Sequence, residues 1–228
     1  MLGILTVNIA AFADVPAAAY GPRPMATSPT GLPSPADHFA FATTMVLFEG
    51  KMRALFSILF GASLLLFIER AEAKGSEGTR MQMRRLGWLA LFGYLHFLLL
   101  WEGDILFLYA LAGLVALPLR HLTPRAMLAT GLAIFALWQV WGASLWVELA
   151  VAEQAVAQGS ASAEQAGMVE DRAGQRQLRN AEALALLRGP YAGQVADKLL
   201  NRPDQPLAGF LYSGAETVAY ILIGMALL

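Results

Sequence analysis

Two polar side chains flank a turn inside an otherwise apolar stretch, GYLHFLLLWEGDILFLYA. His96 and Tyr109 are equally distant from the middle of the turn Trp101–Asp104, so two antiparallel helices would hold them at the same depth and could bring them together. A histidine transfers protons near neutral pH, which makes His96 a candidate general base. The alternative is a neutral histidine that only ties the two helices together. Asp104 stands where the second helix begins, and we expect it to act as an N-cap.

Three further places put polar residues into apolar segments, where charge is costly and indicates function. Glu49 and Arg53 have the i, i+4 spacing of an ion pair, although anchoring at the membrane interface would also explain them. Arg53 would lie about two turns inside its helix and needs an anion, for which Glu216 in SGAETVAYILIGMALL is a candidate. Asn8 lies at a depth similar to that of His96. All of these places fall in the outer half of their predicted helices, which points to one outward-facing polar site.

The composition indicates a polytopic membrane protein. Hydrophobic residues make up 57% and charged residues 14% of the 228 residues, against about 25% charged residues in an ordinary soluble domain. The apolar residues gather in runs typical of transmembrane helices, which predicts an all-α bundle. The net charge of −1 and the lack of a basic stripe with interleaved exposed aromatic residues argue against a nucleic-acid partner. The absence of cysteine and the wide separation of the three histidines disfavour a metal site.

The runs divide one membrane domain, residues 1–228, into about six helices and their connections. The short first run is a partial helix or, alternatively, a signal peptide. The long segment between the fifth and sixth helices contains a short amphipathic helix, which either lies on the outer membrane surface or covers an outer site as a lid. Basic residues place the loop between the second and third helices in the cytoplasm. The predicted membrane helices are 1–13, 45–69, 86–101, 104–119, 125–149 and 207–228, with an outer loop at 14–44, a cytoplasmic loop at 70–85 and an outer segment at 150–206.

Several strings carry a resemblance to a known family. LGILTVNI at 2–9, FEGKMR and LFSILFG at 48–61, and RRLGWLALFGYLHFLLLWEGDILFLYALAG at 84–113 are similar to the YeiB-like family of bacterial inner-membrane proteins, also described as domain of unknown function 418. The core H-x-x-x-x-W-x-G-D-I-L-x-x-Y-A is the most specific of them. Members usually carry Arg-Gly ahead of LGIL and continue beyond GMALL, so the chain resembles the N-terminal half of a member. Its implied partners are the lipid bilayer and either the missing C-terminal helices or further copies of the chain.

The resemblance implies a distant relation to membrane acyltransferases that modify surface glycans, with acyl-CoA or another acyl donor and no other cofactor. In that hypothesis His96 is the base, Arg53 holds an oxyanion or carboxylate, and Asn8, Glu49 and Tyr109 orient the reacting groups. Asn8 stands where the related enzymes have a histidine. A second hypothesis is a transporter or permease component, in which Glu216, His96 and Arg53 line a polar path for a small solute. A third is a truncated, inactive fragment.

Overall fold

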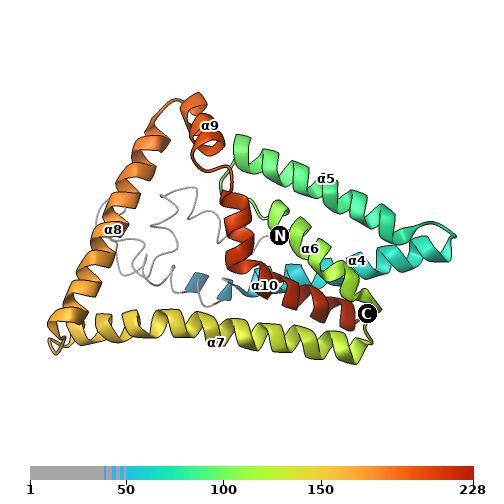
Figure 1. Ribbon diagram of the computed structural model, residues 1–228, viewed down its shortest axis with the longest axis horizontal. Coiled ribbons are helices and arrows are strands. Elements are labelled where there is room, and N and C mark those ends of the chain that lie inside the picture. Colours follow the sequence, from blue (N-terminus) through green and yellow to red (C-terminus); the bar gives the residue numbers. More distant parts are fainter. Residues whose placement is uncertain (1–38, 40–42, 45–46, 49) are drawn as a thin grey trace. The chain divides into compact units, whose positions relative to one another are not determined.

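The computed structural model describes residues 39, 43–44, 47–48 and 50–228 of the chain. The predictions for residues 1–13 and most of those for the loop 14–44, together with Asn8 and Glu49, therefore lie outside the described residues. Within the described part the chain is all-helical, as expected, with seven α-helices, one 3-10 helix and no strand. In chain order these are α4 (Lys51–Ala73), α5 (Gly78–Leu99), α6 (Leu106–Ala116), η2 (Leu117–His121), α7 (Pro124–Ala157), α8 (Ala163–Arg188), α9 (Tyr191–Leu200) and α10 (Gln205–Ala226) (Figure 1).

Three of these helices, α4, α7 and α10, are long and apolar enough to cross a membrane. The predicted count of about six spans is thus supported only in part. The segment expected to form the cytoplasmic loop 70–85 is helical except at the turn 74–77, because α4 continues to Ala73 and α5 already begins at Gly78. The basic residues from 70 to 85 therefore lie mostly on the ends of two helices, and the shift from apolar to charged residues does not mark where these helices end.

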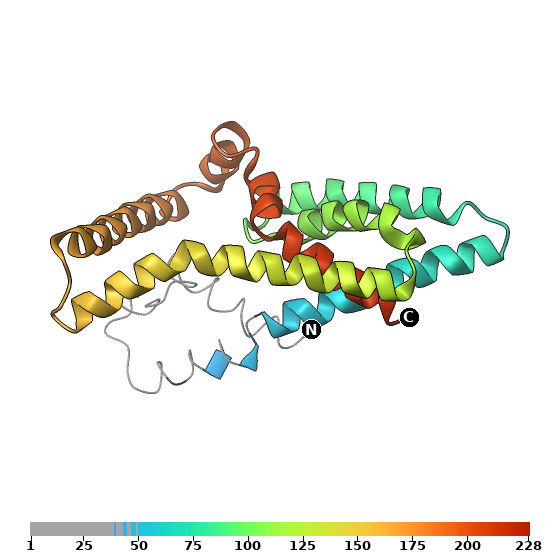
Figure 2. The same ribbon diagram turned by 60° about the horizontal axis from the view of Figure 1, so that its bottom comes forward.

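The chain forms two compact units. The second unit, residues 54–140 and 195–228, contains α5, α6, α10 and most of α4. In both views α6 lies beside α5 and α10 (Figures 1 and 2). The core of this second unit is built almost entirely from aliphatic side chains of α4, α5, α6 and α10, with Met127 from the start of α7. The members of this core include Leu64, Ile68, Leu86, Ala112, Ala116, Val218, Ile221, Leu222 and Met225.

Helices α4 and α10 touch backbone to backbone at two glycines. A Cβ atom at Gly61 would collide with the backbone of Ile221, and one at Gly224 would collide with the backbone of Ile58. The pairing is reciprocal, since each helix contributes one glycine to the crossing. Small residues at such crossings allow the close helix packing that stabilises bundles where the hydrophobic effect is weak.

The first unit contains residues 141–194 together with the start of the chain. Its described helices are the end of α7, all of α8 and the first turn of α9. Helix α8 begins with a capping box: the Ser162 side chain accepts from the backbone N–H of Gln165, and the Gln165 side chain accepts from that of Ser162. The outer segment predicted for residues 150–206 is therefore mostly regular helix, longer and more ordered than a loop with short helices.

Candidate functional site: a histidine and a buried aspartate at a helical hairpin

Helices α5 and α6 form the hairpin that the sequence predicts. Gly93 allows them to meet closely, because a Cβ atom there would collide with the backbone of Phe107. The carbonyl of His96 accepts hydrogen bonds from the backbone N–H groups of Leu100 (2.8 Å) and Trp101 (2.9 Å), which closes the end of α5. The side chain of His96 thus projects from the last turn of α5, beside the start of α6.

His96 lies next to Asp104 across this hairpin. The His96 Nδ1 and Asp104 Oδ1 atoms are 3.1 Å apart, and the Asp104 side chain is 2% exposed. The other carboxylate oxygen of Asp104 accepts a hydrogen bond from the Phe107 N–H at 2.8 Å. That bond holds the carboxylate at the first turn of α6, although the N-cap residue of this helix is Ile105 and Asp104, expected at that position, stands one residue ahead of it. One backbone contact therefore aims the remaining oxygen at the imidazole.

The His96–Asp104 pair has the distance of an ion pair but not the alignment of a hydrogen bond. Both His96 Nδ1 and Asp104 Oδ1 are shielded from solvent and have no other hydrogen-bond partner among the described residues. A buried polar atom without a partner is costly, and a proton on Nδ1 would give each of these atoms a charged partner. Since the His96 side chain is 33% exposed while Nδ1 is buried, the solvent-facing part is the remainder of the ring. The arrangement fits an imidazole oriented by a carboxylate.

Tyr109 has a different polar partner from the one predicted. Its hydroxyl lies 2.7 Å from the Ser57 hydroxyl of α4, and both residues are buried. The rings of Phe56 and Phe60 pack against Tyr109 edge-on, with centroids 5.0 and 5.4 Å away. Sequence reasoning placed Tyr109 opposite His96 and did not single out Ser57. The available signal was the i, i+4, i+11 spacing of Ser57 with Gly61 and Ile68, which marks the buried stripe of α4.

Two cations that the sequence did not single out lie near the end of α5: Lys198 of helix α9, and Arg202, which follows that helix. The Lys198 ammonium donates to the carbonyl of Phe97 at 2.9 Å and lies 5.6 Å from the centre of the Phe97 ring. Phe97 belongs to the last turn of α5, where carbonyls lack partners within the helix and cations are favoured. Burial lowers the pKa of Lys198, and Glu102 opposes that effect.

Arg202 joins the hairpin turn to the end of α9. Its guanidinium contacts Asp197 at 2.6–2.7 Å and Glu102 at 3.3 Å. The pKa of Asp197 lies below its usual value, first because Asn201 donates a hydrogen bond to it and then because of Arg202. Glu102 thus links the hairpin turn to the segment ahead of α10.

The other predicted site residues that the structure describes, Arg53 and Glu216, lie on α4 and α10. Glu216 accepts a hydrogen bond from the Tyr220 hydroxyl at 3.2 Å, one turn further along α10. Arg53 lies in the first turn of α4. The expected pairing of Arg53 with Glu49 or Glu216 stays a prediction. Among the described residues, no group of three histidine and carboxylate side chains could hold a metal ion.

The predicted resemblance to YeiB-like proteins is confirmed. Over 137 residues, 59% of this chain and 32% of the relative, the chain is 35% identical to the uncharacterized protein YeiB of Escherichia coli K12. It is 40% identical over 103 residues to the uncharacterized protein YxaH of Bacillus subtilis, covering 26% of that protein. It is 34% identical over 101 residues to an uncharacterized 39.9 kDa protein of Bacillus acidopullulyticus, covering 29%. The chain therefore matches about a third or less of the length of each of these relatives.

Two further comparisons found no counterpart. No family model matches the chain, so its assignment to domain of unknown function 418 stays a prediction. No solved structure matches it significantly.

Proposed function

We propose that this YeiB homologue is a multi-pass protein of the bacterial inner membrane in which His96 and Asp104 form the basic centre of an acyltransferase. The observation that carries the proposal is the 3.1 Å approach of His96 Nδ1 to a buried carboxylate whose other oxygen is fixed by a backbone N–H. A carboxylate in this position orients the imidazole and stabilises the imidazolium that forms when the base takes a proton. The solvent-facing part of the ring remains for the substrate.

The proposed reaction transfers an acyl group from a thioester, such as acyl-CoA, to a hydroxyl of a surface or periplasmic acceptor. The acceptor hydroxyl loses its proton to Nε2 of His96 and forms a C–O bond to the acyl carbon. The C–S bond breaks, and the departing thiolate takes the proton from Nε2. No redox change occurs, and the imidazole returns to its starting state.

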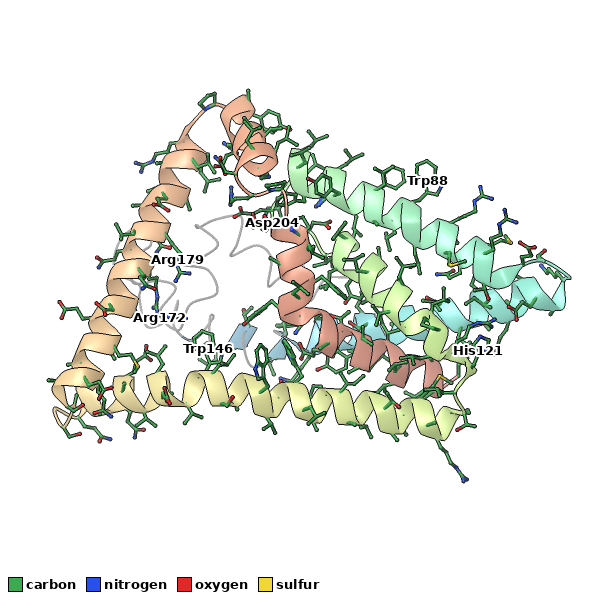
Figure 3. The ribbon with its side chains drawn as sticks, viewed as in Figure 1. Trp88, His121, Trp146, Arg172, Arg179 and Asp204 are labelled. Atoms are coloured by element: carbon green, nitrogen blue, oxygen red, sulfur yellow. The ribbon has the colours of Figure 1, made fainter. Side chains whose placement is uncertain are left out.

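The exposed surface of α5 supports a lipid environment for the hairpin. Large apolar side chains on α5 recur at the spacing i, i+7, i+11, i+14 and i+18, which places them in one stripe along the helix. Trp88 and Phe92 in this stripe are each 57% exposed and stack with ring centres 6.0 Å apart; Trp88 is labelled in Figure 3. The members of the stripe are Met81, Trp88, Phe92, Leu95 and Leu99. A bilayer would cover this stripe.

Charge supports an outward position for the hairpin turn. Five basic residues, Arg70, Lys74, Arg80, Arg84 and Arg85, lie at or near the connection between α4 and α5, and Arg120 and Arg125 lie near the start of α7. The positive-inside rule puts these ends in the cytoplasm. The opposite end of α5, which carries His96, would then face the periplasm.

The alternative function is a transporter or permease component. The observation that favours it is the Ser57–Tyr109 hydroxyl pair, which is buried among apolar side chains where α4 meets α6. Polar groups at such a depth in a membrane bundle frequently belong to a substrate pathway. In this alternative the His96–Asp104 pair would exchange protons during transport.

The test is His96→Gln in the full chain, produced in bacterial membranes and scored for acylation of surface glycans and for solute uptake. The proposal expects acylation to be lost while uptake is unchanged. His121→Gln is the matched control, since it makes the same change in η2, away from the hairpin turn. Loss of uptake alone would favour the transporter, and unchanged results in both assays would refute a role for His96.

A further inference from the structure

Three of the four arginines of helix α8 share one face. Arg172, Arg176 and Arg179 have the spacing i, i+4, i+7, so they lie within about 60° of one another around the helix axis. The four acidic residues of the helix, Glu164, Glu170, Asp171 and Glu182, project from the rest of its surface and are all exposed. Among the described residues, no ion pair joins any of the three arginines to a carboxylate. We name these three residues the arginine face.

Without a negatively charged partner, the arginine face destabilises the folded chain. Like charges spaced i, i+4 on a helix repel each other. Arg172 and Arg176 are moreover partly buried, which strengthens that repulsion. Asn180 lies on the same side, and its amide nitrogen and oxygen are shielded from solvent without a hydrogen-bond partner among the described residues. The face therefore offers several donors to a group that supplies negative oxygen atoms.

The neighbouring tryptophan gives the position of this face relative to a membrane. The Arg172 guanidinium lies 5.1 Å from the centre of the Trp146 ring of α7, and Figure 3 shows Arg172 and Arg179 on the side of α8 that faces Trp146. Helix α7 has 34 residues, about 51 Å in length, whereas the hydrocarbon core is about 30 Å thick. About 20 residues from Pro124, α7 would leave the core close to Trp146, at the depth where tryptophan is enriched.

We propose that the arginine face binds the phosphate of anionic phospholipid headgroups at the membrane surface from which α7 emerges. Guanidinium groups match phosphate oxygens through paired hydrogen bonds, and basic residues near an anionic leaflet are attracted to it. Trp146 places Arg172 at headgroup depth, and Arg176 and Arg179 extend the same face along α8. This site lies in the first unit, so it does not depend on the proposed chemistry of His96.

The test compares the full chain reconstituted in nanodiscs of phosphatidylcholine alone and in an equal mixture with phosphatidylglycerol. Retained phosphatidylglycerol is counted by native mass spectrometry after release into detergent. The variant is Arg176→Gln/Arg179→Gln, which leaves the Arg172–Trp146 contact in place. The control is Arg188→Gln, an arginine of the same helix that lies off the arginine face. Circular dichroism reports whether the helices persist.

The wild-type chain is expected to retain phosphatidylglycerol in preference to phosphatidylcholine. The double variant is expected to bind it on the order of 30-fold more weakly, since two charges near the surface are lost. Arg188→Gln is expected to behave as wild type. Equal retention by the double variant and the wild type would overturn the proposal. It would also be overturned if inorganic phosphate displaced the lipid as well as phosphatidylglycerol vesicles do, because the site would then recognise free phosphate.

Discussion

Asp104→Asn separates the two contacts that Asp104 makes. An asparagine oxygen can still accept the Phe107 N–H, now bound at 2.8 Å, so the start of α6 should persist. The charge beside His96 Nδ1 is lost. Unit charges 3.1 Å apart attract by about 5 kcal/mol at an effective dielectric constant of about 20. Solvent contact at His96 and desolvation of the carboxylate reduce the net effect to roughly 2–4 kcal/mol.

If the imidazolium forms in the transition state of acyl transfer, this loss lowers the rate about 30- to 900-fold. The assay follows a radiolabelled acyl group from its thioester to a hydroxyl acceptor in membranes that contain the chain, and it yields kcat/KM. Asp204→Asn, the same change ahead of α10, is the control and should leave the rate unaltered. A rate for Asp104→Asn within threefold of wild type, with the unfolding temperature unchanged, would show that Asp104 does not assist His96.

Three further predictions concern stability, measured as the unfolding temperature of the purified chain in detergent. Gly224→Ala forces a methyl group against the backbone of α4 and should cost about 1–3 kcal/mol, lowering Tm by about 3–10 °C, while Gly209→Ala in the same helix has open space and should not lower Tm. Lys198→Met removes the hydrogen bond to the Phe97 carbonyl and should lower Tm by about 2–6 °C; an unchanged Tm would mean that this bond contributes nothing. The pKa of Asp197 lies below 3.8 in the folded chain, so its stabilising effect is present above 3.8 and is lost as the pH falls through the folded value. The difference in Tm between wild type and Asp197→Asn should therefore shrink below pH 3.8, and a constant difference would contradict this assignment.

The sequence predicted the hairpin because its determinants are local. Apolar runs on both sides of Glu102-Gly103-Asp104 leave few other conformations, and the break between α5 and α6 falls at residues 100–105. The depth of His96 followed from counting residues from that break. The identity of its partner, Asp104, did not follow from this count. Counting residues gives the depth of a side chain along a helix but not the direction in which it points.

Contacts between distant segments could not be predicted in the same way. Lys198 and Phe97 are 101 residues apart, and Arg202 and Glu102 are 100 residues apart. No periodic pattern in a single sequence indicates that residues so far apart are in contact. Lys198 stands on an amphipathic helix whose polar side would look the same in water, and Arg202 follows that helix. Only the docked arrangement distinguishes a lysine that caps α5 from a solvated one.

The glycine crossing of α4 and α10 has a consequence for biosynthesis. Gly61 packs against Ile221, which leaves the ribosome about 160 residues later. At about 5–20 residues per second, the two contact sites are synthesised about 8–30 s apart. During that interval Ile58 and Gly61 of α4 face lipid or an insertion factor in place of α10. Helix α4 is therefore inserted before α10 is made, and a chain truncated before α10 would lack the contacts of Gly61 with Ile221 and of Gly224 with Ile58.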